Sequence, residues 1–216
     1  MGVSISEQSD RVRERRGAFW QGLGELNDPM GAQGTADQPS LWPSGRSAYR
    51  HVVTRHAGIV TTEGLSDPDP AGGGLGLGVE LYVEGRELVD GMDSDGAWLV
   101  GALEEAAGAF AGAAETLPAA LAEHGLLSLE LSGQGAPEGW SADGRMGALL
   151  GVPLPGRPRE LEVDGGVVRM LCLSPLRPSE LAVIDAEGPV GRQRVADALT
   201  ASGWYSYAET VREPVL

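Results

Sequence analysis

The strongest hydrophobic pattern in the chain lies at residues 167–173, where six of seven positions are apolar and only Arg169 interrupts them. A strand covered on both faces shows such a run, whereas a strand with one solvent-exposed face alternates. Pro175 is expected to end this strand, because proline donates no hydrogen bond to a neighbouring strand. Pro178, with the acidic Glu180 behind it, predicts the first turn of a helix. The pattern therefore predicts a buried strand that leads directly into a helix.

Helical spacing also occurs near the N-terminus. In residues 6–26, side chains separated by three or four positions predict a first helix, with Arg11, Arg13 and Arg15 on its polar side. This is the only basic cluster in the chain. We expect its arginines to pair with acidic residues of the body rather than to bind nucleic acid.

The longest predicted helix covers residues 95–116, because its apolar and alanine positions form one stripe. Pro118 is expected to kink or restart this helix, and Gly125 to end it. Two further helices, each opened by a proline, are expected within residues 178–203. The tail, residues 204–216, concentrates three aromatic side chains in four positions, and we expect them to dock on the body.

The strand signals are local. β-Branched residues predict a hairpin over residues 49–62 with its turn at Ala57-Gly58. Alternation of apolar and acidic residues predicts a strand over residues 79–84 with its acids on a solvent-exposed face. A short strand is expected at residues 126–131, and a second hairpin turns at residues 164–166.

Glycine- and proline-rich stretches at residues 27–46, 64–78 and 132–158 are predicted to be loops. Trp42 and Trp140 are expected to fix two of these loops to the body.

The order of these elements predicts an α+β fold, in which helices pack on a mixed β-sheet. We expect one domain at residues 47–203, preceded by an N-terminal helix and linker at residues 1–46 and followed by an aromatic tail at residues 204–216.

Composition adds a charge asymmetry. The formal net charge is −15, and all 16 basic residues are arginine, which excludes mechanisms that need a lysine nucleophile or a P-loop lysine. Residues 1–50 hold six arginines and six acids, so the excess lies in residues 51–216. Such a charge repels nucleic acid and anionic membranes and favours a basic partner. The alternative interpretation is that the charge only keeps the protein soluble.

Cys172 is the only cysteine, so no internal disulfide is possible and a reducing compartment fits. Its position inside the apolar run predicts a buried, unreactive thiol. We find no signal peptide and no apolar run long enough to span a bilayer, and we expect a cytoplasmic protein.

No pattern singles out a catalytic or metal site. His51 and His56 lie five positions apart in a predicted strand, so their side chains would point to opposite faces and could not bind one metal ion. The GxSxG pattern of a nucleophilic serine does not occur. The glycine run at residues 72–78 precedes a strand, whereas a dinucleotide-binding loop follows one. We therefore expect no catalytic residues, no metal and no cofactor.

Two stretches together resemble the suppressor-of-fused family. The first runs from Thr-Thr-Glu-Gly-Leu-Ser at residues 61–66 to Gly-Val-Glu-Leu at residues 78–81. The second is Leu-Ser-Pro-Leu-Arg-Pro-Ser-Glu-Leu at residues 173–181. Their order, with an alanine-rich helix between them, is also similar. Arg177 departs from the pattern, because the family often has a hydroxyl residue there that is able to cap the helix.

The resemblance implies an α+β domain of a bacterial family member without known catalytic activity. Animal members restrain a transcription factor, and bacterial members look like immunity proteins that neutralise toxins. We therefore predict a non-catalytic domain that binds and masks a protein partner, with a basic toxin as one such partner. The partner-binding residues that we predict are acidic and cluster around one loop and its strand: Glu63, Asp67, Asp69, Glu80 and Glu84.

Two alternatives stay open. A small-ligand-binding protein or a hydrolase could use the loops at residues 64–78 and 132–158 as the rim of a pocket. A histidine beside a carboxylate in such a pocket would favour this alternative. A structural subunit could instead use the aromatic tail to contact a second copy of the chain.

Overall fold

The computed structural model describes residues 4–33, 41–70 and 74–216. Within these ranges the chain forms a mixed β-sheet with helices on both faces, so the predicted α+β fold is confirmed. The strands are β1 (Glu25–Leu26), β2 (Met30–Gln33), β3 (Arg46–Val53), β4 (Gly58–Thr62), β5 (Val79–Gly85), β6 (Leu127–Leu131), β7 (Met146–Leu150), β8 (Glu160–Val163) and β9 (Gly166–Leu176). The helices are α1 (Ile5–Gln21), α2 (Ala97–Gly112), α3 (Leu117–His124), α4 (Pro178–Glu187) and α5 (Pro189–Ala201), with a 3₁₀ turn η1 (Arg86–Leu88).

Strand β9 holds the sheet together. The strand order is β1-β3-β4-β5-β9-β7-β6, while β2 pairs with β3 and β8 pairs with β9. The first part of β9 pairs with β8 and runs parallel to β5, and its last four residues pair with β7 instead. The predicted buried strand is thus confirmed, but Pro175 does not end it. Pro175 pairs with Ala148 of β7 on one side only, and an edge of this kind tolerates proline.

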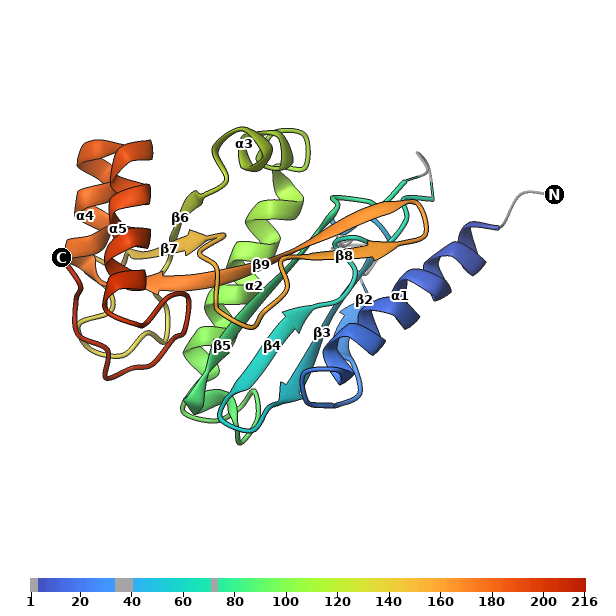
Figure 1. Cartoon of the computed structure of the whole chain (residues 1–216), viewed down its shortest axis with the longest axis horizontal. Coiled ribbons are helices and arrows are strands. Elements are labelled where there is room, and N and C mark those ends of the chain that lie inside the picture. Colours follow the sequence, from blue (N-terminus) through green and yellow to red (C-terminus); the bar gives the residue numbers. More distant parts are fainter. Residues whose placement is uncertain (1–3, 34–40, 71–73) are drawn as a thin grey trace.

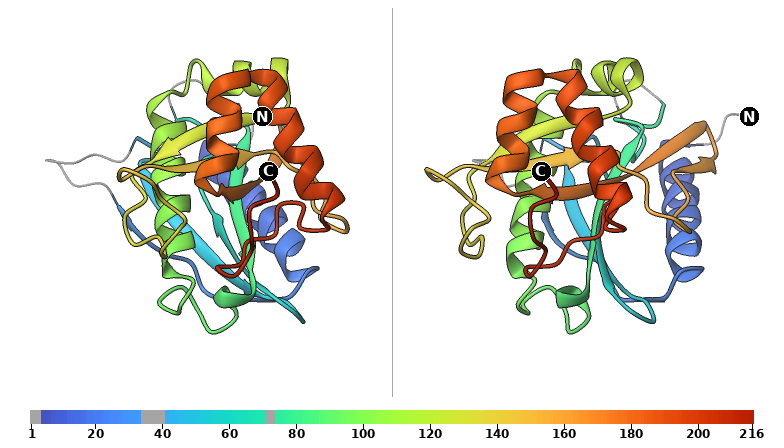
Figure 2. Two further views of the ribbon diagram at one scale, coloured as in Figure 1. Left: turned by 90° about the vertical axis from the view of Figure 1, so that its left-hand side faces the viewer. Right: turned by 60° about the vertical axis from the view of Figure 1, so that its left-hand side comes forward.

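The two faces of the sheet are covered by different helices (Figure 2). Side chains alternate along β9, so that Leu171 and Leu173 pack under α2, while Met170 and Cys172 pack with Trp20 of α1. Helices α4 and α5 pack together beyond β7 at one end of the sheet (Figure 1). The N-terminal helix and the C-terminal tail therefore contact the same sheet as the central residues, and the division at residues 47 and 203 stays a prediction.

Several local predictions are confirmed. The hairpins form as β3–β4 and β8–β9, α3 begins next to Pro118, and prolines open α4 and α5. Trp42 and Trp140 are buried and fix their loops. The indole N–H of Trp140 donates to the carbonyl of Thr210 at 2.9 Å.

Three further predictions are wrong. Strand β5 has no solvent-exposed face, because all seven of its residues are buried between β4 and β9 and under helices on both sides. The stretch at residues 132–158 is not one loop, since it contains the fully buried strand β7. The linker at residues 27–46 contains β2, and residues 34–40 of it lie outside the described residues, as do residues 71–73 of the glycine-rich loop.

Candidate functional site: buried carboxylates and the surface of α2

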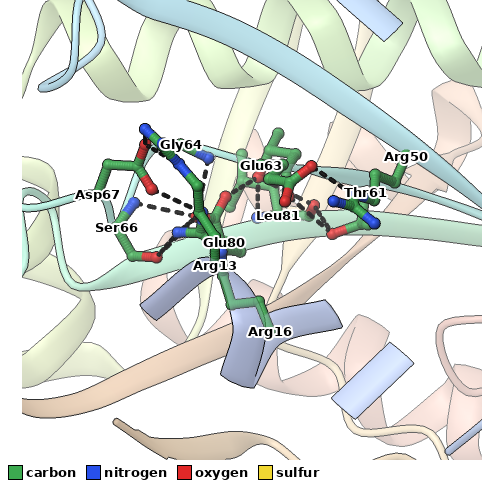
Figure 3. A network of polar contacts seen from close by, with 11 residues as sticks. Arg13, Arg16, Arg50, Thr61, Glu63, Gly64, Ser66, Asp67, Glu80 and Leu81 are labelled. Carbon is green, nitrogen blue, oxygen red and sulfur yellow. Dashed lines mark hydrogen bonds and ion pairs between the residues drawn. The ribbon is translucent and has the colours of Figure 1, made fainter. Parts of the chain in front are cut away.

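Glu80 is the centre of a buried polar network between β4, β5 and α1 (Figure 3). Its side chain has no exposed surface, and it accepts hydrogen bonds from the hydroxyls of Thr62 at 2.5 Å and Ser66 at 2.7 Å. The backbone N–H groups of Gly64 and Ser66 each donate to it at 3.1 Å. A buried carboxylate needs such donors to offset the loss of water. The Thr-x-Gly-Leu-Ser pattern therefore supplies the groups that hold this loop to β5.

Arg16 supplies the opposite charge. Its guanidinium donates to Glu80 at 2.8 Å and to Asp67 at 2.6 Å, and only 2% of its side chain is exposed. Asp67 also accepts a hydrogen bond from Arg13 at 2.7 Å. Burial alone would raise the pKa of Asp67, but the two arginines outweigh it and hold the pKa of this carboxyl below its ordinary value. The expected pairing of the arginine helix with the acidic body is confirmed for Arg11, which contacts Asp164, and for Arg13, whereas Arg15 has no ion pair in the described structure.

The predicted partner-binding carboxylates are mostly paired within the chain. Glu63 accepts from Arg50 at 2.5 Å, and Glu84 accepts two hydrogen bonds from Arg157, at 2.6 and 2.8 Å. Asp69 is half-buried. The structure thus places Glu63, Asp67, Glu80 and Glu84 in buried positions, each with an arginine of the same chain. Partner binding through these five residues stays a prediction.

Glu180 is the centre of a second buried polar network, which holds the C-terminal segment as the Glu80 network holds the N-terminal helix. It is fully buried and forms two hydrogen bonds with the buried Arg212, at 2.6 and 2.8 Å. It also accepts from the backbone N–H groups of Arg177 at 2.8 Å, at the start of α4, and of Val215 at 2.9 Å. Each of the two stretches of family resemblance therefore contributes a fully buried glutamate, Glu80 or Glu180, that binds an arginine from a terminal segment.

The departure at Arg177 has a structural explanation. The guanidinium of Arg177 lies 4.2 Å from the ring centre of Trp140 and donates to the carbonyl of Thr210 at 3.1 Å. Glu180 accepts the backbone N–H of Arg177, as the glutamate of a capping box does, and the N–H of Glu180 donates to the carbonyl of Arg177 at 3.0 Å rather than to a hydroxyl. Arg177 therefore fixes the C-terminal tail. The predicted docking of the tail aromatics is confirmed for Trp204, which packs against the apolar cluster of α4 and α5.

The single cysteine and the histidines form no reactive cluster. Cys172 is buried, and burial raises its pKa to about 12. His51 is buried with one ring nitrogen 2.6 Å from the carbonyl oxygen of Leu88, whereas His56 and His124 are exposed. Among the described residues, no three histidine, cysteine or acidic side chains lie together as metal ligands. Across the same ranges, no helix has the length and apolar character that crossing a membrane requires.

A groove that the sequence did not reveal runs between β2 and the outer face of α2. It has a volume of about 660 Å³, and its described lining contains apolar side chains, two carboxylates and no basic residue: Met30, Gly31, Ser47, Tyr49, Met92, Asp93, Ala97, Val100, Gly101 and Glu104. A smaller hollow of about 330 Å³ shares Gly101 and Glu104 with it and adds Glu105 and Met146. Met30, Met92 and Met146 lie far apart in the sequence, so the sequence did not show that they line this groove and the hollow next to it.

A second hollow, of about 510 Å³, lies beside the aromatic tail. It is lined by Leu154, Pro155 and Gly203 together with aromatic and ionisable side chains: His56, Arg86, Trp204, Tyr205, Tyr207 and Glu209. The rings of Trp204 and Tyr207 are stacked with their centres 6.5 Å apart. A histidine and a carboxylate thus share one hollow, although no hydrogen bond between His56 and Glu209 occurs in the described structure.

Comparison with known proteins identifies solved structures with a similar fold. No family model matches the sequence, and no curated protein matches it significantly. A chain of the Sufu–Fu complex crystal structure superimposes with a TM-score of 0.53 and 12% sequence identity, covering 96% of this chain and 92% of that one. The crystal structure of Drosophila Suppressor of Fused gives a TM-score of 0.47 at 11% identity, and the match covers 96% of this chain and 51% of that one. The chain therefore has a fold similar to that of suppressor-of-fused structures over almost its whole length.

Proposed function

We propose that this chain is a non-catalytic protein-binding domain that masks a basic segment of a protein partner, and that the groove along α2 is its binding surface. The single observation that carries the proposal is the composition of this groove, in which methionine and other apolar side chains lie beside Asp93 and Glu104. Both carboxylates are exposed, and neither is ion-paired within the part of the chain that the structure describes.

The chemistry of the groove fits a partner segment with both apolar and basic side chains. Methionine adapts to irregular partner surfaces because its side chain is unbranched and polarisable. Unpaired carboxylates attract arginine or lysine and raise the association rate. The acidic body, with a formal charge of −15 for the whole chain, adds to this attraction.

The fold supports the same conclusion. The similar chain in the Sufu–Fu complex belongs to an assembly of two proteins. In the present chain, the carboxylates of the Glu80 and Glu180 networks are saturated by donors and by arginine, so they are built to stabilise the fold rather than to exchange protons. A more specific form of the proposal is an immunity protein that neutralises a basic toxin by covering its surface.

The test is affinity capture from the native host with the complete chain as bait. We expect recovery of a basic protein that is released by salt, that binds the double variant Asp93→Asn/Glu104→Gln at least about tenfold more weakly, and whose toxicity the chain suppresses on co-expression. The matched control is Glu14→Gln/Glu162→Gln, which removes the same charge from exposed residues outside the groove. Equal binding by both variants would rule out the groove, and a recovered partner without toxicity would rule out the immunity role.

The hollow beside the tail favours a second candidate, a small-ligand-binding protein. The stacked rings of Trp204 and Tyr207 lie beside Arg86, whose contact with Glu209 is long at 3.6 Å, and this arrangement suits a flat or cyclic ligand with an acidic group. Screening of small cyclic acids by thermal shift, with Trp204→Leu as the comparison variant, tests this candidate. Stabilisation that Trp204→Leu does not reduce would count against it.

A further inference from the structure

A further cavity, open to solvent, lies on the face of the sheet that α2 and α3 cover, between the end of α3 and the β8–β9 hairpin. Ala122, Arg159 and Glu160 at its rim are exposed. Its volume is about 620 Å³, and it is lined by Leu121, Ala122, Gly125, Arg159, Glu160, Arg169 and Leu171. This size is in the range of cavities that hold small molecules. Nothing in the proposed protein-binding function uses this cavity.

The strand register explains how two arginines reach one cavity. Arg169 lies directly opposite Glu160 on the paired strands β9 and β8. Because side chains alternate along a strand, Arg169 points to the same face as Leu171, which packs in the core with Leu121 of α3. Arg159 is held beside β9 because its carbonyl accepts a hydrogen bond from the N–H of Met170 at 2.8 Å.

These two arginines differ from most others in the chain. Within the described ranges, nine arginines are within 4.0 Å of a carboxylate: Arg11, Arg13, Arg16, Arg50, Arg86, Arg145, Arg157, Arg194 and Arg212. Arg159 and Arg169 have no such partner in the described structure, although the chain has 31 acidic residues and Glu160 lines the same cavity. Their guanidinium donors are therefore available to a ligand.

The charges and walls of the cavity select the kind of ligand. Two arginines and one glutamate leave a net charge of +1 among the lining residues, which balances one negative charge and not two. The last turn of α3, at Leu121 and Ala122, adds the partly negative end of a helix, which further disfavours a dianion. Leu121, Ala122 and Leu171 offer an apolar wall next to the two guanidinium groups.

We propose that this cavity binds a small organic carboxylate, whose carboxylate is held by Arg159 and Arg169 and whose hydrocarbon part packs against Leu121, Ala122 and Leu171. A planar guanidinium group binds a carboxylate through two parallel hydrogen bonds, so the arginines fix the acid group of the ligand. The apolar wall selects the hydrocarbon part of the ligand.

The probes are hexanoate, its neutral analogue hexanamide and inorganic phosphate, titrated into the complete chain by calorimetry and by NMR of the backbone amides. We expect saturable binding of hexanoate with shifts at Leu121, Ala122 and Leu171, and binding of hexanamide and phosphate at least about tenfold weaker. Equal affinity for hexanamide, tighter binding of phosphate, or no saturable binding of hexanoate would overturn the proposal.

Variants locate the site. Arg169→Gln is expected to weaken hexanoate binding about tenfold, because a charge-assisted hydrogen bond is lost. Ala122→Trp is expected to weaken it as well by filling the cavity while leaving both arginines in place. The matched control is Arg55→Gln, which removes the same charge from an exposed arginine in the β3–β4 turn. A loss of binding in Arg55→Gln as large as in Arg169→Gln would show unspecific attraction and would overturn the proposal. Thermal unfolding of each variant confirms that it is folded.

Discussion

At the scale of single residues, the stability of this protein depends on buried charges that are almost fully satisfied. Glu80 accepts hydrogen bonds from one guanidinium, two hydroxyls and two backbone N–H groups. The surrounding donors make the network selective for a carboxylate, because no neutral side chain of the same size accepts them all. Each charge in the network therefore stabilises the folded state most when the other charges are present.

The first prediction concerns Glu80→Gln, which removes the negative charge but keeps the shape of the side chain. Arg16 then lies buried with less compensation, and breaking a buried ion pair costs about 3–5 kcal/mol. We expect a decrease of this size in the free energy of unfolding, measured by urea denaturation. Glu14→Gln, on the exposed side of α1, is the control and is expected to leave the free energy unchanged. A Glu80→Gln variant as stable as the control would contradict the role of the network.

The second prediction concerns pH. Arg16 and Arg13 lower the pKa of Asp67 in the folded protein from its ordinary value of 3.8, although burial opposes them. A carboxyl with a lowered pKa in the folded state stabilises the fold above its unfolded pKa and loses this contribution as the pH falls toward the folded pKa. We expect the free energy of unfolding to fall as the pH decreases from about 4, the unfolded pKa of aspartate.

Asp67→Asn is the comparison variant for this experiment. It is expected to be less stable at pH 7 and to lose less stability between pH 5 and pH 3 than the unmodified chain, as urea denaturation at several pH values would show. Parallel plots of unfolding free energy against pH for the two proteins would contradict a lowered pKa of Asp67 in the folded state.

At the scale of elements, the terminal segments are fixed by arginine rather than by apolar packing alone. Arg16 of α1 binds Glu80, and Arg212 of the tail binds Glu180. Both glutamates belong to the central part of the chain, on β5 and at the start of α4. A buried ion pair therefore holds each terminal segment on the body of the protein.

The third prediction compares a buried ion pair with an exposed one in the same part of the structure. Arg212→Gln leaves Glu180 without its buried partner and is expected to cost about 3–5 kcal/mol of unfolding free energy. Arg194→Gln breaks the exposed pair with Glu187 on α4 and α5, which is worth about 0–1 kcal/mol. Thermal and urea unfolding of both variants provide the measurement. Similar losses in the two variants would show that the tail contributes no more than a surface contact.

The fourth prediction uses Cys172 as a reporter of strand β9. Burial raises the pKa of this thiol to about 12, so little thiolate is present at neutral pH. Because β9 pairs with β5, β7 and β8, the thiol becomes accessible only when the sheet opens. We expect its reaction with a thiol reagent to follow the urea dependence of global unfolding. Rapid labelling of the native protein would contradict this account.

At the scale of the whole molecule, the fold shows which acidic residues are already paired within the chain and which remain unpaired at its surface. Of the acids predicted to contact a partner, Glu63, Asp67, Glu80 and Glu84 are bound by arginines of the same chain. The unpaired Asp93 and Glu104 lie instead at the α2 groove.

The fifth prediction follows from this distribution and concerns the partner proposed above. Its association rate should fall steeply as ionic strength rises, because exposed charges attract over about 10 Å and salt screens this attraction. The dissociation rate should change much less. Stopped-flow or biosensor measurements at several salt concentrations separate the two rates. An association rate independent of salt would contradict electrostatic attraction.

The sequence by itself determined most of the elements and their order, because hydrophobic spacing, prolines and glycine turns act over a few residues. It predicted the two hairpins, the buried strand β9, the starts of α4 and α5 and the buried Cys172. It also predicted that arginines of α1 pair with the acidic body, since a body with an excess of acidic residues attracts the only basic cluster in the sequence.

Only the tertiary structure decided which acids are exposed and which are buried. Alternation along β5 predicted exposed acids, but β4, β9 and the helices surround this strand, and burial depends on neighbours that are distant in the sequence. The same holds for the α2 groove and for the pair of Arg159 and Arg169, whose members meet because of strand pairing and helix packing. A local pattern fixes backbone conformation, whereas the surroundings of a charge are fixed by the long-range contacts of the fold.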